Sequence, residues 1–212
     1  MATQVGTLLY NRLTDEFDMR KHLRNGTPID NLTQVRNTAF EVFKAKGFPS
    51  IKEEDWRFTN LVPFLDAQFA INAIPASEEK IQAIIDNATI KGLDSYRLVL
   101  VNGSIHFAAS ILPNDSQVII KTTQSIANTD VFETHANTKD HVGGNAVVAL
   151  NTALFTDGFY MEIKQNAVVE KPIHIIHVYT TEENTFFQPR HLVIVNKHAK
   201  AEIIETSIVV KE

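Results

Sequence analysis

Tyr160–Val169 reads Tyr-Met-Glu-Ile-Lys-Gln-Asn-Ala-Val-Val, and this stretch has a counterpart thirty-two positions later. The counterpart, Leu192–Ala201, reads Leu-Val-Ile-Val-Asn-Lys-His-Ala-Lys-Ala. In both copies a short apolar run is followed by a polar corner. Each copy then continues through a Glu into a second apolar run, Ile173–Tyr179 in the first and Ile203–Val210 in the second. A fixed period of strand, corner and strand is typical of a stacked β architecture, in which each coil covers the apolar face of its neighbour.

Stacks of this kind need about three coils to be stable. The sequence supplies roughly two and ends in Ile208-Val209-Val210, which reads as a strand. We therefore expect the chain to be a fragment that stops inside its own β domain. The predicted division is a helical region over 1–95, a connecting region with a hairpin over 96–150, and the start of the β coils over 151–212. The predicted fold class is α+β.

The composition is that of a globular protein, with 44% hydrophobic and 21% charged residues among 212. A net charge of −5 argues against a nucleic-acid-binding face, which requires clustered Lys and Arg. No apolar run approaches the roughly 20 residues that span a bilayer, so we expect no membrane contact. Polar residues interrupt the N-terminal apolar run that a signal peptide would need, and we expect a cytoplasmic protein. Because the chain has no cysteine, it offers no disulfide, thiol nucleophile or thiolate ligand.

Helical periodicity dominates the first ninety residues. A first helix is predicted with an apolar face formed by Val5, Leu8, Leu9 and Leu13, and Phe17 continues this face one turn further. The clearest helix runs to Lys46, with Gly47 at the position of a left-handed C-terminal cap. The residues that form its stripe are Leu32, Val35, Ala39, Val42, Phe43 and Lys46.

A third helix and a hairpin follow. Ser77 is the predicted N-cap of a helix whose buried stripe includes Ile81 and Ile85. Further on, Asn102-Gly103 lies between two apolar runs and predicts a hairpin with a type I′ turn. A short strand is expected at Val118–Ile120. The segment Ala146–Leu154 is compatible with a helix or with the first β coil.

Most candidate sites fail for a physical reason. No Gly-x-x-x-x-Gly-Lys-Ser/Thr stretch exists, and Gly143-Gly144-Asn145 lacks the spacing of a dinucleotide-binding loop. Asp140-His141 has no evident serine partner for a hydrolytic triad. Trp56 reads as an anchor for the Gly47–Leu61 segment, together with Phe48 and Leu61, rather than as a substrate platform.

The histidines invite a metal interpretation, especially His174, His177, His191 and His198. His174 and His177 differ by three positions, so on a strand they face opposite sides and cannot jointly chelate an ion. His198 occupies a corner of the repeat, where a polar residue is expected in any case. We therefore interpret these histidines as surface or stacking residues. We assign no catalytic, cofactor-binding or metal-ligating residue.

One segment carries a family resemblance. Arg36-Asn37-Thr38-Ala39-Phe40, Phe43, Gly47-Phe48-Pro49 and Glu53–Leu61 (Glu-Glu-Asp-Trp-Arg-Phe-Thr-Asn-Leu) resemble the N-terminal signature of the SufD branch of the SufB/SufD family. That family belongs to the Suf machinery for iron–sulfur cluster assembly. The later segments that resemble its entry into a β-helix are Leu150-Asn151-Thr152-Ala153, Asp157-Gly158, Lys171–Ile175 (Lys-Pro-Ile-His-Ile) and Pro189-Arg190.

This resemblance implies that the helical region leads into the first coils of a right-handed parallel β-helix. It also implies a scaffold role without enzymatic activity, with SufB and the SufC ATPase as partners of the full-length protein. The segment that binds SufC and the part of the β-helix that pairs with SufB are expected to lie outside this chain. No cofactor is expected in the chain itself, since the ligands of a nascent cluster would come mostly from SufB.

Two other classes stay open. A carbohydrate-active β-helix enzyme would need acidic or basic pairs on successive coils. The aligned corner positions offer no carboxylate pair; they are Lys164/Asn196, Gln165/Lys197 and Asn166/His198. A generic protein-interaction adaptor is the second alternative. In either case the uncovered terminal strands, Leu192–Val195 and Ile203–Val210, predict a homodimer formed by strand pairing.

Overall fold

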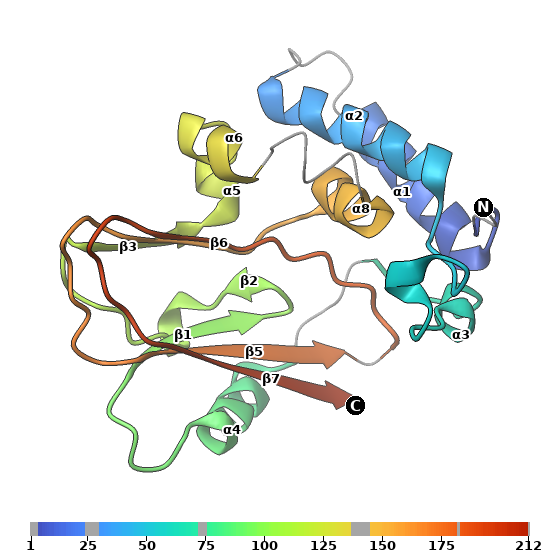
Figure 1. Ribbon diagram of the computed structural model, residues 1–212. Helices are drawn as coiled ribbons and strands as arrows, with labels where there is room; N and C mark the ends of the chain where they lie inside the picture. Colours follow the sequence, from blue (N-terminus) through green and yellow to red (C-terminus); the bar gives the residue numbers. More distant parts are fainter. Residues whose placement is uncertain (1–3, 24–29, 72–75, 137–144, 182, 212) are drawn as a thin grey trace. The chain divides into compact units, whose positions relative to one another are not determined.

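The computed structural model describes residues 4–23, 30–71, 76–136, 145–181 and 183–211 (Figure 1). The chain divides into two compact units, each assembled from two separate stretches. Unit 1 comprises Met1–Ile71 and Ala127–Phe155, and unit 2 comprises Asn72–Ile126 and Thr156–Glu212. This grouping differs from the sequential division at 95 and 150, and residue 151 lies inside a helix of unit 1. Within the described ranges, no helix has the length and apolarity needed to cross a bilayer.

Unit 1 is helical. Its elements are α1 (Leu8–Leu23), α2 (Asn31–Lys46), the 3-10 helix η1 (Glu54–Trp56), α3 (Val62–Leu65), α6 (Asp130–Ala136) and α8 (Ala146–Leu154). Asp30 caps the start of α2, because its side chain accepts a hydrogen bond from the Thr33 N–H at 2.7 Å. Asn145 does the same for α8 with the N–H groups of Val147 and Val148. Ala146–Leu154 is therefore a helix and not a β coil.

The core of unit 1 forms where α1 and α2 bury one face each. Phe17 and Phe40 stack with their ring centroids 3.8 Å apart, and Leu13 is fully buried beside them on α1. The predicted apolar face of α1 is wrong at its first two positions. Val5 precedes the helix and Leu8 begins it, and both are about half exposed. The buried face instead continues through Glu16, whose carboxylate pairs with Arg20 at 2.7 Å.

Two arginines hold the C-terminal end of α8. Arg20 Nη1 donates to the Leu154 carbonyl at 2.9 Å, and Arg36 Nη2 donates to the Phe155 carbonyl at 2.9 Å. The Arg36 guanidinium also lies over the Phe155 ring, 4.5 Å from its centroid. Because the last carbonyls of a helix have no partner within the helix, cationic donors stabilise them by hydrogen bonding and through the helix dipole. Arg36 therefore joins α2 to α8.

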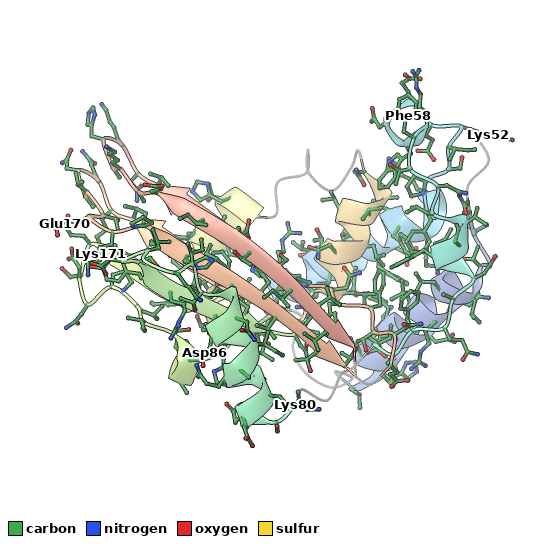
Figure 2. The ribbon with its side chains drawn as sticks, turned by 90° about the horizontal axis from the view of Figure 1, so that it is seen from below. Lys52, Phe58, Lys80, Asp86, Glu170 and Lys171 are labelled. Carbon is green, nitrogen blue, oxygen red and sulfur yellow. The ribbon has the colours of Figure 1, made fainter. Side chains whose placement is uncertain are left out.

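The turn after α2 follows the prediction in part. Gly47 adopts φ 63°, and its N–H donates to the Phe43 carbonyl at 2.7 Å, which closes the helix. Phe48 is 4% exposed and packs edge-on against Phe43 with centroids 5.2 Å apart. Trp56 does not join this core. Trp56 is only half buried, η1 buries no residue, and the nearby Phe58 is 87% exposed (Figure 2).

Unit 2 is built from two sheets and a covering helix. Its elements are α4 (Glu78–Ala88), β1 (Tyr96–Val101), β2 (Ser104–Ile105), the 3-10 helix η2 (Phe107–Ala109), β3 (Val118–Thr122), α5 (Thr123–Ile126), β4 (Phe159–Ile163), β5 (Ile173–Thr181), β6 (Leu192–Val195) and β7 (Ile203–Lys211). One sheet has the strand order β2-β1-β5-β7 and the other has the order β3-β4-β6. The predicted helix from Ser77 is confirmed, and so is the type I′ turn, with φ 50° at Asn102 and 91° at Gly103.

The repeat forms two stacked coils. The first coil runs from β4 through a corner to β5, the second runs from β6 through a corner to β7, and both strand pairs are parallel. Tyr160 pairs with Leu192, in agreement with the thirty-two-residue period. Beyond the corner Ile173 pairs with Ile203, thirty residues away, because the second copy lacks a counterpart of Lys171-Pro172. Figure 2 shows Lys171 at this corner end of the strands.

The corners stack as closely as the strands do. Asn166 and His198 occupy equivalent positions with φ 64° and 61°. The backbone N–H of Asn166 donates to the Lys197 carbonyl at 3.1 Å, and that of Lys200 donates to the Ala167 carbonyl at 2.8 Å. Because each coil satisfies the backbone groups of the other through the bend, the two coils form one continuous hydrogen-bonded ladder.

Side chains alternate between two cores along β5. Ile173 and Ile175 lie in the core between the two sheets, which also holds Leu98, Leu100, Phe159, Met161, Ile163 and Ala167. Ile176 and Val178 point to the opposite face, where Ile81 and Ile85 of α4 cover them. A strand buried on both faces explains why Ile173–Tyr179 reads as a nearly continuous apolar run.

We predict that Phe48→Ala lowers the free energy of unfolding by about 3–5 kcal/mol, since it removes a buried ring from the core of unit 1. Trp56→Ala removes a half-exposed ring and should cost roughly 1 kcal/mol. Urea unfolding of the two variants measures this difference. Equal losses for the two variants would show that Trp56 supports the core after all.

Candidate functional site

The Asp157-Gly158 and Pro189-Arg190 segments meet where the two coils begin. The Arg190 N–H donates to the Asp157 carbonyl at 2.9 Å, so the entry to β6 lies directly on the entry to β4. A Cβ atom on Gly158 would overlap the Arg190 carbonyl oxygen. Gly158 is therefore required by the close approach of the backbones of the two coils.

Thr123 ties β3 to the same junction. Its N–H donates to the Gly158 carbonyl at 3.1 Å, and its hydroxyl donates to the Arg190 carbonyl at 2.7 Å. The residue is fully buried. The junction thus joins three segments that lie far apart in the sequence.

Two of the four singled-out histidines come together directly after this junction. The His191 and His177 ring centroids are 5.3 Å apart, and His191 also stacks on Phe159 at 4.4 Å. His177 Nε2 hydrogen-bonds Glu205 Oε1 at 2.7 Å. We refer to His177, His191 and Glu205 as the interior histidine cluster.

The hydrogen bonds assign the protons of these rings. His191 Nδ1 accepts from the Phe159 N–H at 3.2 Å, so the neutral ring carries its proton on Nε2. His177 is 5% exposed, and its Nδ1 has no hydrogen-bond partner. When His177 Nε2–H donates to Glu205, Nδ1 is left as a buried acceptor.

Burial controls the charge of the cluster. Desolvation and the neighbouring His177 lower the pKa of His191 to about 4, although Glu205 opposes the shift. Desolvation also lowers the pKa of Arg190, and it raises the pKa of Tyr179, whose ring lies 6.3 Å from that of His177. His191 is therefore uncharged at neutral pH.

The other two histidines lie elsewhere. His174 is fully buried on the α4-facing side of β5, where Nε2 hydrogen-bonds Thr206 Oγ1 at 2.8 Å. His177 faces the opposite core, so the prediction that His174 and His177 point to opposite sides is confirmed. His198 is exposed at its corner, as predicted. These histidines were interpreted as surface or stacking residues. His174 and His177 are not at the surface, because β5 is covered on both faces, but the rings of His177 and His191 do stack, on Tyr179 and Phe159 respectively.

The cluster was missed because its members belong to different strands. His177, His191 and Glu205 have no common sequence spacing, and only the coil register brings them together. Among the described residues, no three His, Cys, Asp or Glu side chains converge in a way that could hold a metal ion. Asp140, His141, Gly143 and Gly144 lie outside the described residues. The arrangement orients the His177 and Glu205 side chains through their hydrogen bond.

We predict that Gly158→Ala strongly destabilises unit 2, because the added methyl group overlaps the backbone of the neighbouring coil. Gly92→Ala is the matched control. Gly92 has φ 79° and no atom within 4 Å of a built Cβ, so this change tests backbone conformation alone, at about 1 kcal/mol. Thermal unfolding should show a much larger loss for Gly158→Ala. Similar losses would rule out the steric explanation.

We also predict that acid destabilises the protein through His191. The pKa is lower in the folded state than the ordinary 6.5, so the stabilisation is complete above pH 6.5 and is lost as the pH falls towards 4. The loss should be on the order of 2 kcal/mol, because one pKa unit equals about 1.4 kcal/mol and partial exposure reduces the effect.

His191→Gln keeps an acceptor for the Phe159 N–H but cannot titrate. Urea unfolding between pH 7 and 4 should therefore show a shallower decline for this variant. The exposed His135 provides the control, since His135→Gln should leave the decline unchanged. An unchanged slope in His191→Gln would assign the acid sensitivity to other groups.

Comparison with known proteins identifies the family. Residues 9–175 match the family described as the SufBD protein N-terminal region. Over 189 residues the chain is 26% identical to an iron–sulfur cluster assembly SufBD family protein of Synechocystis sp.. The alignment covers 86% of this chain and 40% of that protein, so the chain spans well under half the length of this relative. The family match begins in α1 and ends within β5, so it includes β4, the first strand of the first coil, but not β6 or β7 of the second. On this evidence the chain belongs to the SufBD family.

Proposed function

We propose that the chain acts as a scaffold in iron–sulfur cluster assembly, as a SufD-type subunit without enzymatic activity of its own. The observation that carries this proposal is the family match over residues 9–175. The two stacked parallel coils of the structure, β4 with β6 and β5 with β7, support it. The Synechocystis relative is described as an iron–sulfur cluster assembly protein, which supports the same process for this chain.

We propose that the chain works with SufB and the SufC ATPase in the cytoplasm, and that its coils form part of a right-handed parallel β-helix. Two features support a partner-dependent role. The chain has no cysteine, so it cannot supply the thiolate ligands that usually hold an iron–sulfur cluster. It also has no P-loop, so ATP hydrolysis would have to come from a partner.

The residues of the family signature have structural roles that suit a scaffold. Arg36 joins two helices, Gly47 and Phe48 close the turn after α2, and Gly158 permits the coils to stack. A carbohydrate-active enzyme gains no support, since the stacked corner positions Asn166 and His198 provide no acid–base pair.

The test is made in cells. An affinity tag on the chromosomal copy should recover SufB and the SufC ATPase in fixed stoichiometry, identified by mass spectrometry. Deletion of the gene should lower the cluster content of iron–sulfur enzymes without lowering their polypeptide levels. A tagged protein that recovers neither subunit, in cells whose iron–sulfur enzymes are unaffected, would overturn the proposal.

The isolated chain provides the complementary prediction. Anaerobic incubation with iron and sulfide should not produce a stoichiometric iron–sulfur chromophore, because thiolate ligands are absent. Visible absorption and iron analysis after desalting measure this outcome. A stable chromophore at one cluster per chain would show that the chain ligates a cluster by itself.

A further inference from the structure

The side chain of Asn102 continues the pairing of β1 with β5 where the main chain of β1 turns away. The last paired residues of the two strands are Val101 and Val178. The Asn102 N–H donates to the Val178 carbonyl at 2.8 Å. Beyond it, the Asn102 side chain binds the Thr180 backbone twice. Nδ2 donates to the Thr180 carbonyl at 3.1 Å, and Oδ1 accepts from the Thr180 N–H at 3.0 Å. We refer to these two hydrogen bonds as the Asn102 clamp.

Thr180 needs this clamp because it is buried. The residue is 1% exposed, and buried backbone groups without a partner are destabilising. The main chain of β1 offers no group here, since the chain reverses at Asn102-Gly103 into β2. A side-chain amide combines donor hydrogens with an acceptor oxygen, so it takes the place of a peptide group. The clamp therefore fixes the tip of the β1–β2 hairpin to the end of β5.

The same asparagine precedes a glycine, and Asn-Gly pairs are especially prone to deamidation. Glycine has no side chain to shield its backbone nitrogen. In the reaction the Gly103 N forms a bond to Asn102 Cγ, the Cγ–Nδ2 bond breaks, and the proton of the Gly103 N–H leaves with Nδ2 as ammonia. Water then opens the five-membered succinimide at one of its two carbonyl groups. The products are aspartate and isoaspartate.

The conformation of the turn opposes this ring closure. The ring requires Asn102 Cβ and the Gly103 N to be eclipsed about the Asn102 Cα–C bond. Asn102 has φ 50° and Gly103 has φ 91°, the values of a type I′ turn, whose first central residue has a ψ of about 30°. In an L-residue with this ψ, Cβ and the following nitrogen lie nearly opposite each other. The Gly103 N reaches Cγ only after the turn has changed its conformation.

The clamp and the contacts of Gly103 hold the turn in this conformation. A Cβ built on Gly103 would lie 3.2 Å from Pro189 Cβ, so the hairpin tip also touches the segment that leads into β6. Because Nδ2 is the leaving atom and Cγ has to approach the Gly103 N, ring closure breaks both hydrogen bonds to Thr180. We propose that Asn102 is a deamidation site that the fold keeps closed and that reacts only when the Asn102 clamp opens.

Neither product restores the clamp. The aspartate carboxylate only accepts hydrogen bonds, so it lacks the proton that Nδ2 donates and places a negative charge beside the Thr180 carbonyl oxygen. Isoaspartate adds a methylene group to the main chain at residue 102 and does not fit a two-residue turn. Deamidation therefore releases the hairpin tip from β5 irreversibly.

The rate of the reaction tests the proposal directly. The protein and a synthetic peptide with the sequence of residues 98–107 are incubated at neutral pH, and mass spectrometry of proteolytic fragments follows the conversion of Asn102. The folded protein should react about tenfold more slowly than the peptide or less, since local opening has to precede the reaction. Concentrated urea should raise the rate in the protein to that of the peptide. Equal rates in the folded protein and the peptide would overturn the proposal.

Two substitutions at Thr180 separate the clamp from the rest of the fold. Thr180→Pro removes the N–H that Asn102 Oδ1 accepts, and this N–H faces Asn102 and not β7, so the ladder with β7 is kept. Thr180→Val keeps the N–H and replaces a buried hydroxyl that has no hydrogen-bond partner. Folded Thr180→Pro should deamidate about tenfold faster than the wild type, and Thr180→Val should match the wild type. Equal rates in the two variants would exclude a role of the clamp.

Hydrogen exchange provides a readout that does not depend on deamidation. Asn102→Gly keeps a residue that favours the positive φ of the turn but removes the side chain of the clamp. The Thr180 amide should then exchange about tenfold faster by NMR, while the Val178 amide on the same strand should keep its rate. Circular dichroism confirms that each variant is folded. An unchanged exchange rate at Thr180 would show that the clamp does not hold this end of β5.

Discussion

Backbone hydrogen bonding between successive coils is the constraint on which unit 2 depends. The ladder runs from β4 and β6 through the corner and on to β5 and β7 without interruption, since the corner residues Asn166 and Lys200 also bond to the neighbouring coil. This continuity requires the two backbones to approach closely along their whole length. At Gly158 the two backbones are so close that a Cβ atom would overlap the Arg190 carbonyl oxygen. Thr123 binds the same Arg190 carbonyl through its hydroxyl. The strands, the corners and the two cores are all positioned by this contact.

The same register determines which polar groups meet inside the stack. β5 is covered on both faces, so its two histidines must each find a partner on an adjacent strand. His174 finds Thr206 on one face, and His177 finds Glu205 on the other. His191 contacts the His177 ring because it lies just before β6, next to the junction at Gly158, where its Nδ1 accepts a hydrogen bond from the Phe159 N–H. Burial keeps His191 neutral, while Glu205 stays partly exposed on the last strand. The cluster therefore connects the interior of the coils to β7.

Unit 1 is organised by a different interaction, the binding of helix-end carbonyls by arginine. Arg20 and Arg36 reach Leu154 and Phe155 from two separate helices, and they are joined across more than a hundred residues of sequence. This contact gives a structural role to Arg36, the first residue of the segment that resembles the SufD signature. It also explains why the helix Ala146–Leu154 groups with the N-terminal helices and not with the coils that follow it directly in the chain. This chain therefore leaves the helical unit and returns to it before the stacked coils begin.

Local sequence determined much of this protein. The period between Tyr160 and Leu192, the N-cap at Ser77 and the Asn102-Gly103 turn depend on contacts within a few residues or on direct repetition, and each was predicted correctly. Gly47 ends α2 with a positive φ as predicted, but its ψ of −168° is not that of a left-handed helical cap. Only the tertiary structure decided the rest. Whether Trp56 or Phe48 enters the core depends on the space left by α2, and whether His177 meets His191 and Glu205 depends on the register between coils. Sequence periodicity records which face of an element is apolar, but it does not record which distant element will cover that face. The physical reason is that long-range packing and strand register are fixed by the joint fit of many side chains, and no short stretch contains that information.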